Sequence, residues 1–159
     1  MGNIFSGSEI LGIGIQIEIN GKAFYETLSA KTKSNAAREI FNFLAGEESR
    51  HISVFEAMLT TVENNLPAES YPEEYSAYMK ELASEHIFTR KDKGVELARA
   101  ARSDKEAIEK GIGFEKDSII FYEGMKKIIP TYDLKVIDGL IEQEKLHLVK
   151  LTELAKNIK

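Results

Sequence analysis

The sequence contains one short motif twice, as Leu44-Ala-Gly-Glu-Glu-Ser-Arg-His51 and as Leu140-Ile-Glu-Gln-Glu-Lys-Leu-His147. A leucine, a glutamate and a histidine coincide in the two copies. The glutamate and the histidine are three residues apart, and residues at that spacing project from the same face of a helix. A single copy is weak evidence for a site, because both residue types are common on solvated helix faces. The repetition makes the pattern informative.

A second repeat precedes each copy of this motif. Gly14-Ile-Gln-Ile-Glu18 followed by Phe24-Tyr25-Glu26 matches Gly111-Ile-Gly-Phe-Glu115 followed by Phe121-Tyr122-Glu123. The two halves of the chain therefore look like copies of one helical hairpin, with a glutamate on the first helix and Glu-x-x-His on the second. Packed together, four such helices would direct six side chains at the bundle centre, and these are our candidate metal ligands: Glu18, Glu48, His51, Glu115, Glu144 and His147.

The spacing of apolar residues predicts four long helices. A Ser-x-x-Glu pair at Ser103 and Glu106 is typical of a helix start, and Pro130 forces a turn. One local signal disagrees: isoleucines alternate from Ile13 to Ile19 as in a half-buried strand. The repeat overrules that alternative. We expect helices over residues of about 8–31, 35–63, 103–128 and 133–157.

The segment between the second and third helices, about residues 64–102, joins the two halves. It contains a short amphipathic stretch from Glu73 to His86 and is too short and too helical for an independent domain. Two helical hairpins joined by one long crossover is the ferritin-like connectivity. The sequence thus predicts an all-α, ferritin-like antiparallel four-helix bundle, with residues 1–159 as a single domain.

Composition narrows the chemistry of the predicted site. The chain has no cysteine, which excludes thiolate-bound zinc and iron–sulfur centres within it. Four buried carboxylates are unfavourable without cations, and two divalent ions would neutralise them. Carboxylates with imidazoles suit iron or manganese. The alternative is an inherited site that is empty or holds zinc.

Charge and hydropathy bear on partners. The net charge of −5, with both signs spread along the chain, argues against nucleic acid and an anionic membrane surface. No apolar run approaches the roughly 20 residues that span a bilayer. Residues 1–5 lack the features of a signal peptide. We therefore expect no nucleic-acid partner and no membrane association.

Five further polar residues leave alternatives open. Tyr25 and Tyr122 each follow a candidate ligand by two helical turns, so they are either core aromatics or hydrogen-bond donors to those carboxylates. Glu47 and Gln143 precede the paired glutamates and either contact the outer nitrogens of the histidines or are solvated. His86 lacks a partner at ligand spacing, and we expect it on the surface of the crossover.

From about residue 7 to 157 the sequence resembles the rubrerythrin di-iron domain of the ferritin-like superfamily. The resemblance rests on Glu18-x6-Tyr25, Glu48-x-x-His51, Phe114-Glu-Lys-Asp-Ser-Ile-Ile-Phe-Tyr122 and Gln143-Glu-Lys-Leu-His147. It implies two iron ions per subunit, with manganese or zinc as possible substitutes. It also implies bridging by Glu48 and Glu144, terminal or mobile ligands at Glu18 and Glu115, and one iron anchored by each of His51 and His147.

The resemblance further implies an oxidoreductase in a prokaryotic cytoplasm. A diferrous site would react with hydrogen peroxide or dioxygen and be reduced again by an external carrier. A homodimer is implied as well, with or without exchange of helices. Two alternatives from other classes are ferroxidation and iron binding without repeated peroxide reduction, and a non-catalytic metal-binding protein.

Two departures from the family pattern concern the reaction. Rubrerythrins carry a C-terminal rubredoxin domain, whereas this sequence ends at Lys159 without a cysteine, so we expect a separate electron donor such as a rubredoxin-type protein. Rubrerythrins also have a further glutamate three residues after the third-helix ligand, and here that position is Ser118. The resemblance is therefore more specific for the metal site than for the reaction.

Overall fold

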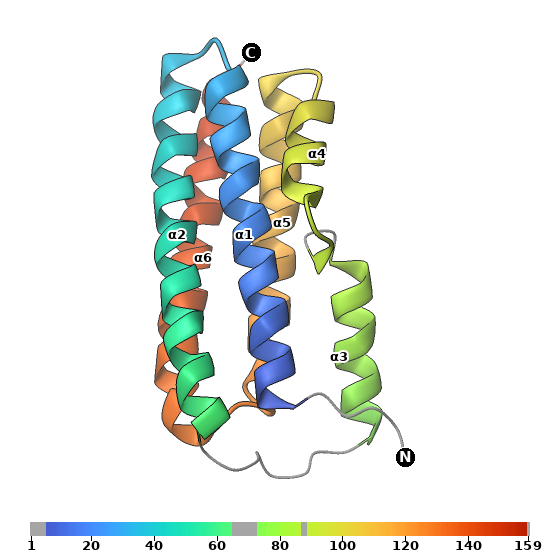
Figure 1. The fold of residues 1–159 in the computed structure, drawn as a ribbon. Helices are drawn as coiled ribbons and strands as arrows, with labels where there is room; N and C mark the ends of the chain where they lie inside the picture. The colour runs from blue at the N-terminus through green and yellow to red at the C-terminus, as the bar shows by residue number, and fades with distance from the viewer. Residues whose placement is uncertain (1–5, 65–72, 87–88, 159) are drawn as a thin grey trace.

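The computed structural model describes residues 6–64, 73–86 and 89–158, and it is helical apart from turns (Figure 1). Four long helices form the bundle: α1 (Gly7–Lys31), α2 (Asn35–Asn64), α5 (Asp104–Met125) and α6 (Leu134–Asn157). The crossover contributes α3 (Glu73–Glu85) and α4 (Lys93–Ala100), and a short 3-10 turn, η2 (Thr131–Asp133), precedes α6. The prediction of an all-α bundle is confirmed. Residues 65–72 and 87–88 of the expected crossover, and residues 1–5, lie outside the described residues.

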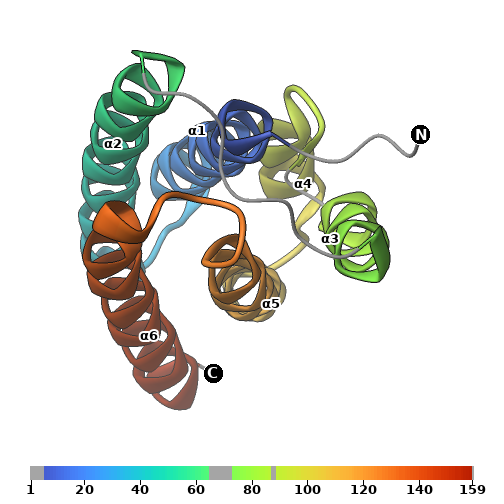
Figure 2. The same cartoon turned by 90° about the horizontal axis from the view of Figure 1, so that it is seen from below.

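The bundle consists of two helical hairpins that pack against each other. α1 contacts α2, α5 contacts α6, and the hairpins meet through α2 with α6 and α1 with α5. Figure 2 shows the four long helices around a common centre, with α3 and α4 outside it. α4 packs on α1 and α3 packs on α5, so the crossover covers one side of the bundle.

Capping side chains and tight turns set the helix ends. Before α1, the Ser6 hydroxyl accepts from the Glu9 N–H while the Glu9 carboxylate accepts from the Ser6 N–H, a reciprocal cap. Before α5, the Ser103 hydroxyl accepts from the Glu106 N–H, as the sequence predicts. α5 ends at Met125, earlier than the expected Ile128, because the chain there turns tightly with Ile128 N–H bonded to the Met125 carbonyl.

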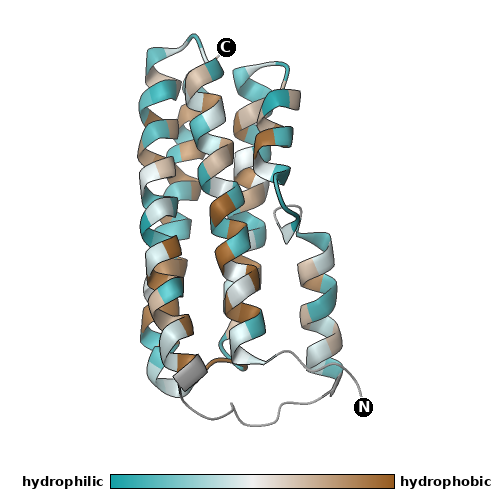
Figure 3. Ribbon diagram, in the orientation of Figure 1, coloured by the Kyte–Doolittle hydropathy of each residue, from teal (hydrophilic) through white to brown (hydrophobic). Residues whose placement is uncertain are grey.

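Residues 13–19 belong to α1 and do not form a strand. Ile17 is buried while Ile19 is 45% exposed, so the alternating isoleucines do not share one face. The buried positions of α1 instead recur every three or four residues. Figure 3 shows hydrophobic residues interspersed with hydrophilic ones along this helix. Gly21 allows a close approach, since a Cβ there would lie 2.7 Å from the Phe114 ring.

None of the helices among the described residues combines the length and apolar character needed to cross a membrane.

Candidate metal centre

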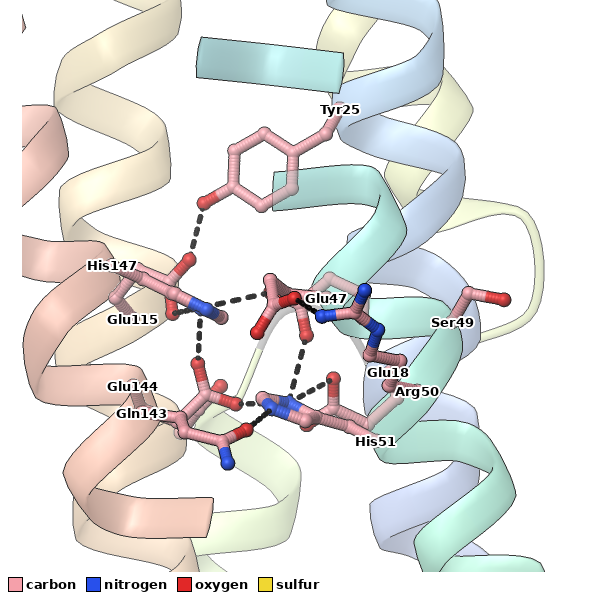
Figure 4. Close-up of polar contacts among 12 residues, drawn as sticks. Glu18, Tyr25, Glu47, Ser49, Arg50, His51, Glu115, Gln143, Glu144 and His147 are labelled. Carbon is pink, nitrogen blue, oxygen red and sulfur yellow. Dashed lines mark hydrogen bonds and ion pairs between the residues drawn. The ribbon is translucent and has the colours of Figure 1, made fainter. Parts of the chain in front are cut away.

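The four long helices bring the six predicted residues together in the middle of the bundle (Figure 4). α1 supplies Glu18, α5 supplies Glu115, and the other two helices each supply a glutamate and a histidine one turn apart. All six side chains are buried, although the sequence places them in two halves of the chain. We refer to this set as the carboxylate cage: Glu18, Glu48, His51, Glu115, Glu144 and His147.

The cage contains two overlapping groups of ligand atoms. The first consists of Glu18, Glu48, His51 and Glu144, and its ligand atoms all lie within 4.8 Å of one another. His51 Nδ1 is 2.9 Å from Glu144 Oε1, 3.3 Å from Glu48 Oε2 and 3.5 Å from Glu18 Oε2. These three oxygens and one nitrogen converge on one position.

The second group resembles the first, but its histidine and its unshared glutamate come from the other hairpin. It consists of Glu48, Glu115, Glu144 and His147. His147 Nδ1 is 2.9 Å from Glu144 Oε2, 3.5 Å from Glu48 Oε1 and 3.7 Å from Glu115 Oε2. Glu48 and Glu144 thus belong to both groups and present one oxygen to each histidine.

Several cage atoms are buried without a hydrogen bond. They are Glu18 Oε2, both oxygens of Glu48, His51 Nδ1, Glu115 Oε2, Glu144 Oε1 and His147 Nε2. Burying polar atoms in this way costs free energy unless another group satisfies them. The carboxylate oxygens and His51 Nδ1 carry lone pairs that a divalent cation would accept, and oxygen with imidazole nitrogen is a donor set for iron or manganese. The residues present therefore fit a pair of metal ions.

Without cations, the cage balances its charge with protons. Burial, followed by the charges of Glu48 and Glu144, raises the pKa of Glu18 well above its ordinary value. Burial and the same two charges also raise the pKa of Glu115. Burial alone would lower the pKa of His147, but hydrogen bonds to the surrounding carboxylates outweigh it and raise that pKa to about 12. Cation binding would displace these protons.

Two tyrosines hold the terminal glutamates from the opposite hairpin. Tyr25 on α1 donates a 2.6 Å hydrogen bond to Glu115 Oε1, and Tyr122 on α5 donates to Glu18 Oε1. Both side chains are fully buried. Of the two alternatives for these tyrosines, the structure contains the hydrogen-bonded one. These bonds leave the second oxygen of each glutamate directed at a histidine.

The residues that precede the paired glutamates lie on the outer side of the histidines. His51 Nε2 is 2.7 Å from Gln143 Oε1, so the amide can accept the outer N–H of that ring. Glu47 pairs with Arg50 and lies close to both histidine rings. Of the two alternatives for Gln143, the structure shows contact with the outer nitrogen of a histidine. Such outer hydrogen bonds orient the ring of a metal-binding histidine.

His86 is not a surface residue, so that expectation was wrong. Its side chain is 2% exposed, and its Nε2 lies 3.2 Å from the Ser118 hydroxyl. The sequence did hold a signal: His86 continues the buried stripe of the crossover helix, after Met79 and Leu82 at spacings of three and four residues.

A helical bundle that directs four glutamates and two histidines at one another has the ligand arrangement of the di-metal carboxylate proteins. The chain belongs to the rubrerythrin family, whose model matches residues 9–155. It is also similar to a solved structure from Thermotoga maritima, described as a ferritin-like diiron-carboxylate protein, with 27% identity and a TM-score of 0.68 over 98% of each chain. A comparison with curated proteins finds no significant match.

Proposed function

We propose that this protein is a di-iron oxidoreductase that reduces hydrogen peroxide or dioxygen with electrons from an external carrier. The observation that carries the proposal is the sharing of Glu48 and Glu144 by two adjacent groups of ligand atoms. Two ions held side by side by common carboxylates can act together on one small oxidant. The rubrerythrin family and the similar diiron-carboxylate structure support this reading.

The cage residues take distinct roles in this proposal. Glu18 and His51 would hold one ion and Glu115 and His147 the other, while Glu48 and Glu144, which belong to both groups of ligand atoms, would be shared by the pair. When bound, two ferrous ions supply the two electrons that cleave the O–O bond of hydrogen peroxide. Tyr25 and Tyr122 fix the terminal carboxylates, and the buried aromatic side chains around them exclude bulk water. Manganese or zinc would fit the same donors.

Partners follow from the balance of this reaction. Reducing one hydrogen peroxide to two waters takes two electrons and two protons. We propose that an external carrier, such as a rubredoxin-type protein, returns the electrons. A homodimer in the cytoplasm completes the proposal. Exposed apolar side chains on α6, namely Val136, Leu146 and Val149, are consistent with a second copy.

Single mixing of the anaerobic, iron-loaded protein with each oxidant tests this function. We expect oxidation of the ferrous site to be faster with hydrogen peroxide than with dioxygen, and repeated turnover when a reduced rubredoxin-type protein is present. Oxidation much faster with dioxygen would contradict the peroxidase assignment. Oxidation without turnover, with the iron retained or released as ferric ion, would instead favour ferroxidation and iron handling.

A further inference from the structure

Ser118 occupies a position beside the cage that the proposed function does not yet use. On α5, Glu115, Ser118 and Tyr122 are three and four residues apart, so they lie on one stripe of the helix. All three side chains are fully buried. Glu115 is a cage residue and the Tyr122 hydroxyl donates to another, Glu18. Ser118 therefore shares one stripe of α5 with a cage residue and with a tyrosine that donates to another cage residue.

The partner of Ser118 is His86, which comes from the crossover. The chain holds His86 firmly: its N–H donates to the Leu82 carbonyl at 2.9 Å, and its carbonyl accepts from the N–H and hydroxyl of Thr89. Its ring meets Phe114 and Phe121 nearly at right angles. These contacts keep Nε2 within hydrogen-bonding distance of the Ser118 hydroxyl.

His86 is buried, but it borders a cavity that opens at the surface. It lines a cavity of about 150 Å³ together with Leu82, Glu85, Asp117 and Ile120. The charged groups there, Glu85 and Asp117, are exposed to solvent. Burial lowers the pKa of His86 to about 4, so its ring is neutral at pH 7. A neutral imidazole can take up a proton on one nitrogen and release one from the other.

Among the described residues, further polar groups approach the cage from the side of the histidines: Gln143 contacts His51, and Glu47 lies close to both rings. A histidine that binds a metal through one nitrogen cannot pass protons by exchanging its ring N–H between the two nitrogens. The sequence has three histidines, and His86 is the one outside the proposed ligand set. Phe114 closes the space beside Gly21, and Phe55 closes the space beside Gly14.

We propose that His86 and Ser118 form the path by which protons move between the surface cavity and the carboxylate cage. One ring nitrogen of His86 takes up a proton from solvent in the cavity as Nε2 gives its proton to the Ser118 oxygen, and the serine passes its own hydroxyl proton on toward the cage. Return of the ring proton to Nε2 and rotation of the serine hydroxyl then reset the path. This inference rests on the proposed function, because the reduction of each hydrogen peroxide to water consumes two protons.

Proton exchange of the Tyr122 hydroxyl with solvent tests the path without catalysis. It would be measured by NMR in the full-length, zinc-loaded protein and in the variants Ser118→Ala and His86→Phe. We expect exchange at Tyr122 to slow by at least about tenfold in both variants. The Tyr25 hydroxyl, which lies beside Gly111 away from Ser118, serves as the internal reference. Ser118→Thr keeps a hydroxyl and should stay near the wild-type rate.

The direction of the change separates a path from a structural role. A variant that merely loosens the bundle would open more often, so exchange would become faster at both tyrosines. Exchange at Tyr122 that stays within about twofold of wild type in Ser118→Ala, or that speeds up at both tyrosines, would overturn the proposal.

Reactivity with peroxide gives a second reading. In Ser118→Ala and His86→Phe we expect oxidation about 10- to 100-fold slower than in wild type, with unchanged iron content. A wild-type protein that does not react with peroxide would refute the proposed function. The proton-exchange rates at Tyr122 would still test the proposed path in that case. Equal oxidation rates in wild type and both variants would refute the path alone.

Discussion

Glu144 makes the closest contacts to both histidines of the cage. Its Oε1 lies 2.9 Å from Nδ1 of His51, and its Oε2 lies 2.9 Å from Nδ1 of His147. Hydrogen bonds to these two histidines outweigh the effect of burial and lower the pKa of Glu144, so it remains a carboxylate without metal. One charged side chain thus serves both candidate metal positions.

Replacing Glu144 by alanine should therefore remove at least one metal ion from each chain. The measurement is metal analysis of the folded variant after anaerobic iron loading. Glu142→Gln on the same helix is the matched control, since Glu142 is exposed and pairs only with Lys145 among the described contacts. If the Glu144→Ala protein retained both ions, the proposed ligand set would be wrong.

Gln143 tests the outer side of the cage. Replacing it by leucine removes the oxygen that lies 2.7 Å from His51 Nε2, so that the ring loses its orienting contact. Loss of such a partner lowers metal affinity by roughly 10-fold or more. Competition with a zinc chelator would show weaker binding of one ion of the two. Unchanged affinity for both ions would mean that Gln143 is only a solvated neighbour.

The metal-free protein should become less stable as the pH rises, because the cage then loses protons that it binds more tightly in the folded state. The pKa of His147 is raised from its ordinary value of 6.5 to about 12, so the folded state binds more protons than the unfolded chain above pH 6.5. The raised pKa of His51, Glu18 and Glu115 acts in the same direction. The contribution of the histidines is complete below pH 6.5 and is lost as the pH rises toward 12, whereas that of Glu18 and Glu115 is complete below pH 4.5.

Urea unfolding with a chelator present, at pH 6.5 and at pH 9, measures this effect. We expect a smaller free energy of unfolding at pH 9. With zinc the decrease should be offset or reversed, because metal binding releases protons and strengthens with pH. A metal-free protein that is more stable at pH 9 would show that the cage does not hold these protons.

The cage residues could be identified from the sequence because their spacing occurs twice. A helix places residues three apart on one face whatever surrounds them, and the duplication excluded chance. His86 could not be placed in the same way. The periodicity of the crossover helix indicates that His86 is buried, but the surface that buries it, α5 with Ser118, follows from tertiary packing and not from the local pattern.

At the scale of elements, α4 is held on α1 by side-chain hydrogen bonds at both of its ends and by a close backbone contact. Near the end of α4, Lys31 Nζ donates to the Arg99 carbonyl at 2.9 Å. Asn20 donates from Nδ2 to the Arg90 carbonyl at 2.6 Å and accepts from the Gly94 N–H at 3.0 Å. A Cβ on Gly94 would collide with the Asn20 carbonyl oxygen. Only glycine therefore permits this approach, which fixes the end of the crossover.

Replacing Gly94 by alanine should destabilise the protein by about 1–3 kcal/mol, because backbone atoms must move to accept the methyl group. Chemical denaturation measures the change. Gly139→Ala on α6 is the control, since nothing lies within 4 Å of a Cβ there, and it should stabilise by up to about 1 kcal/mol through helix propensity. Equal effects of the two substitutions would contradict the close contact.

The same contact explains why the crossover was predicted less well than the bundle. Apolar periodicity and caps indicate where long helices run, and the repeat set their pairing. α4 is short and joins α1 through Asn20, a residue more than 70 positions earlier in the chain. No window of local sequence reports a contact of that separation.

At the scale of the whole molecule, the cage joins the two hairpins. α1 and α2 provide Glu18, Glu48 and His51, and α5 and α6 provide the other half. Each candidate metal position takes ligands from both hairpins, because Glu48 and Glu144 belong to both groups. Metal ions would therefore link the two halves and stabilise their packing.

The metal content of the full-length protein after anaerobic loading with ferrous iron tests the central claim most directly. The two overlapping ligand groups predict about two iron ions per folded chain. Retention of less than one ion per chain, in a sample shown to be helical by circular dichroism, would contradict the di-iron centre.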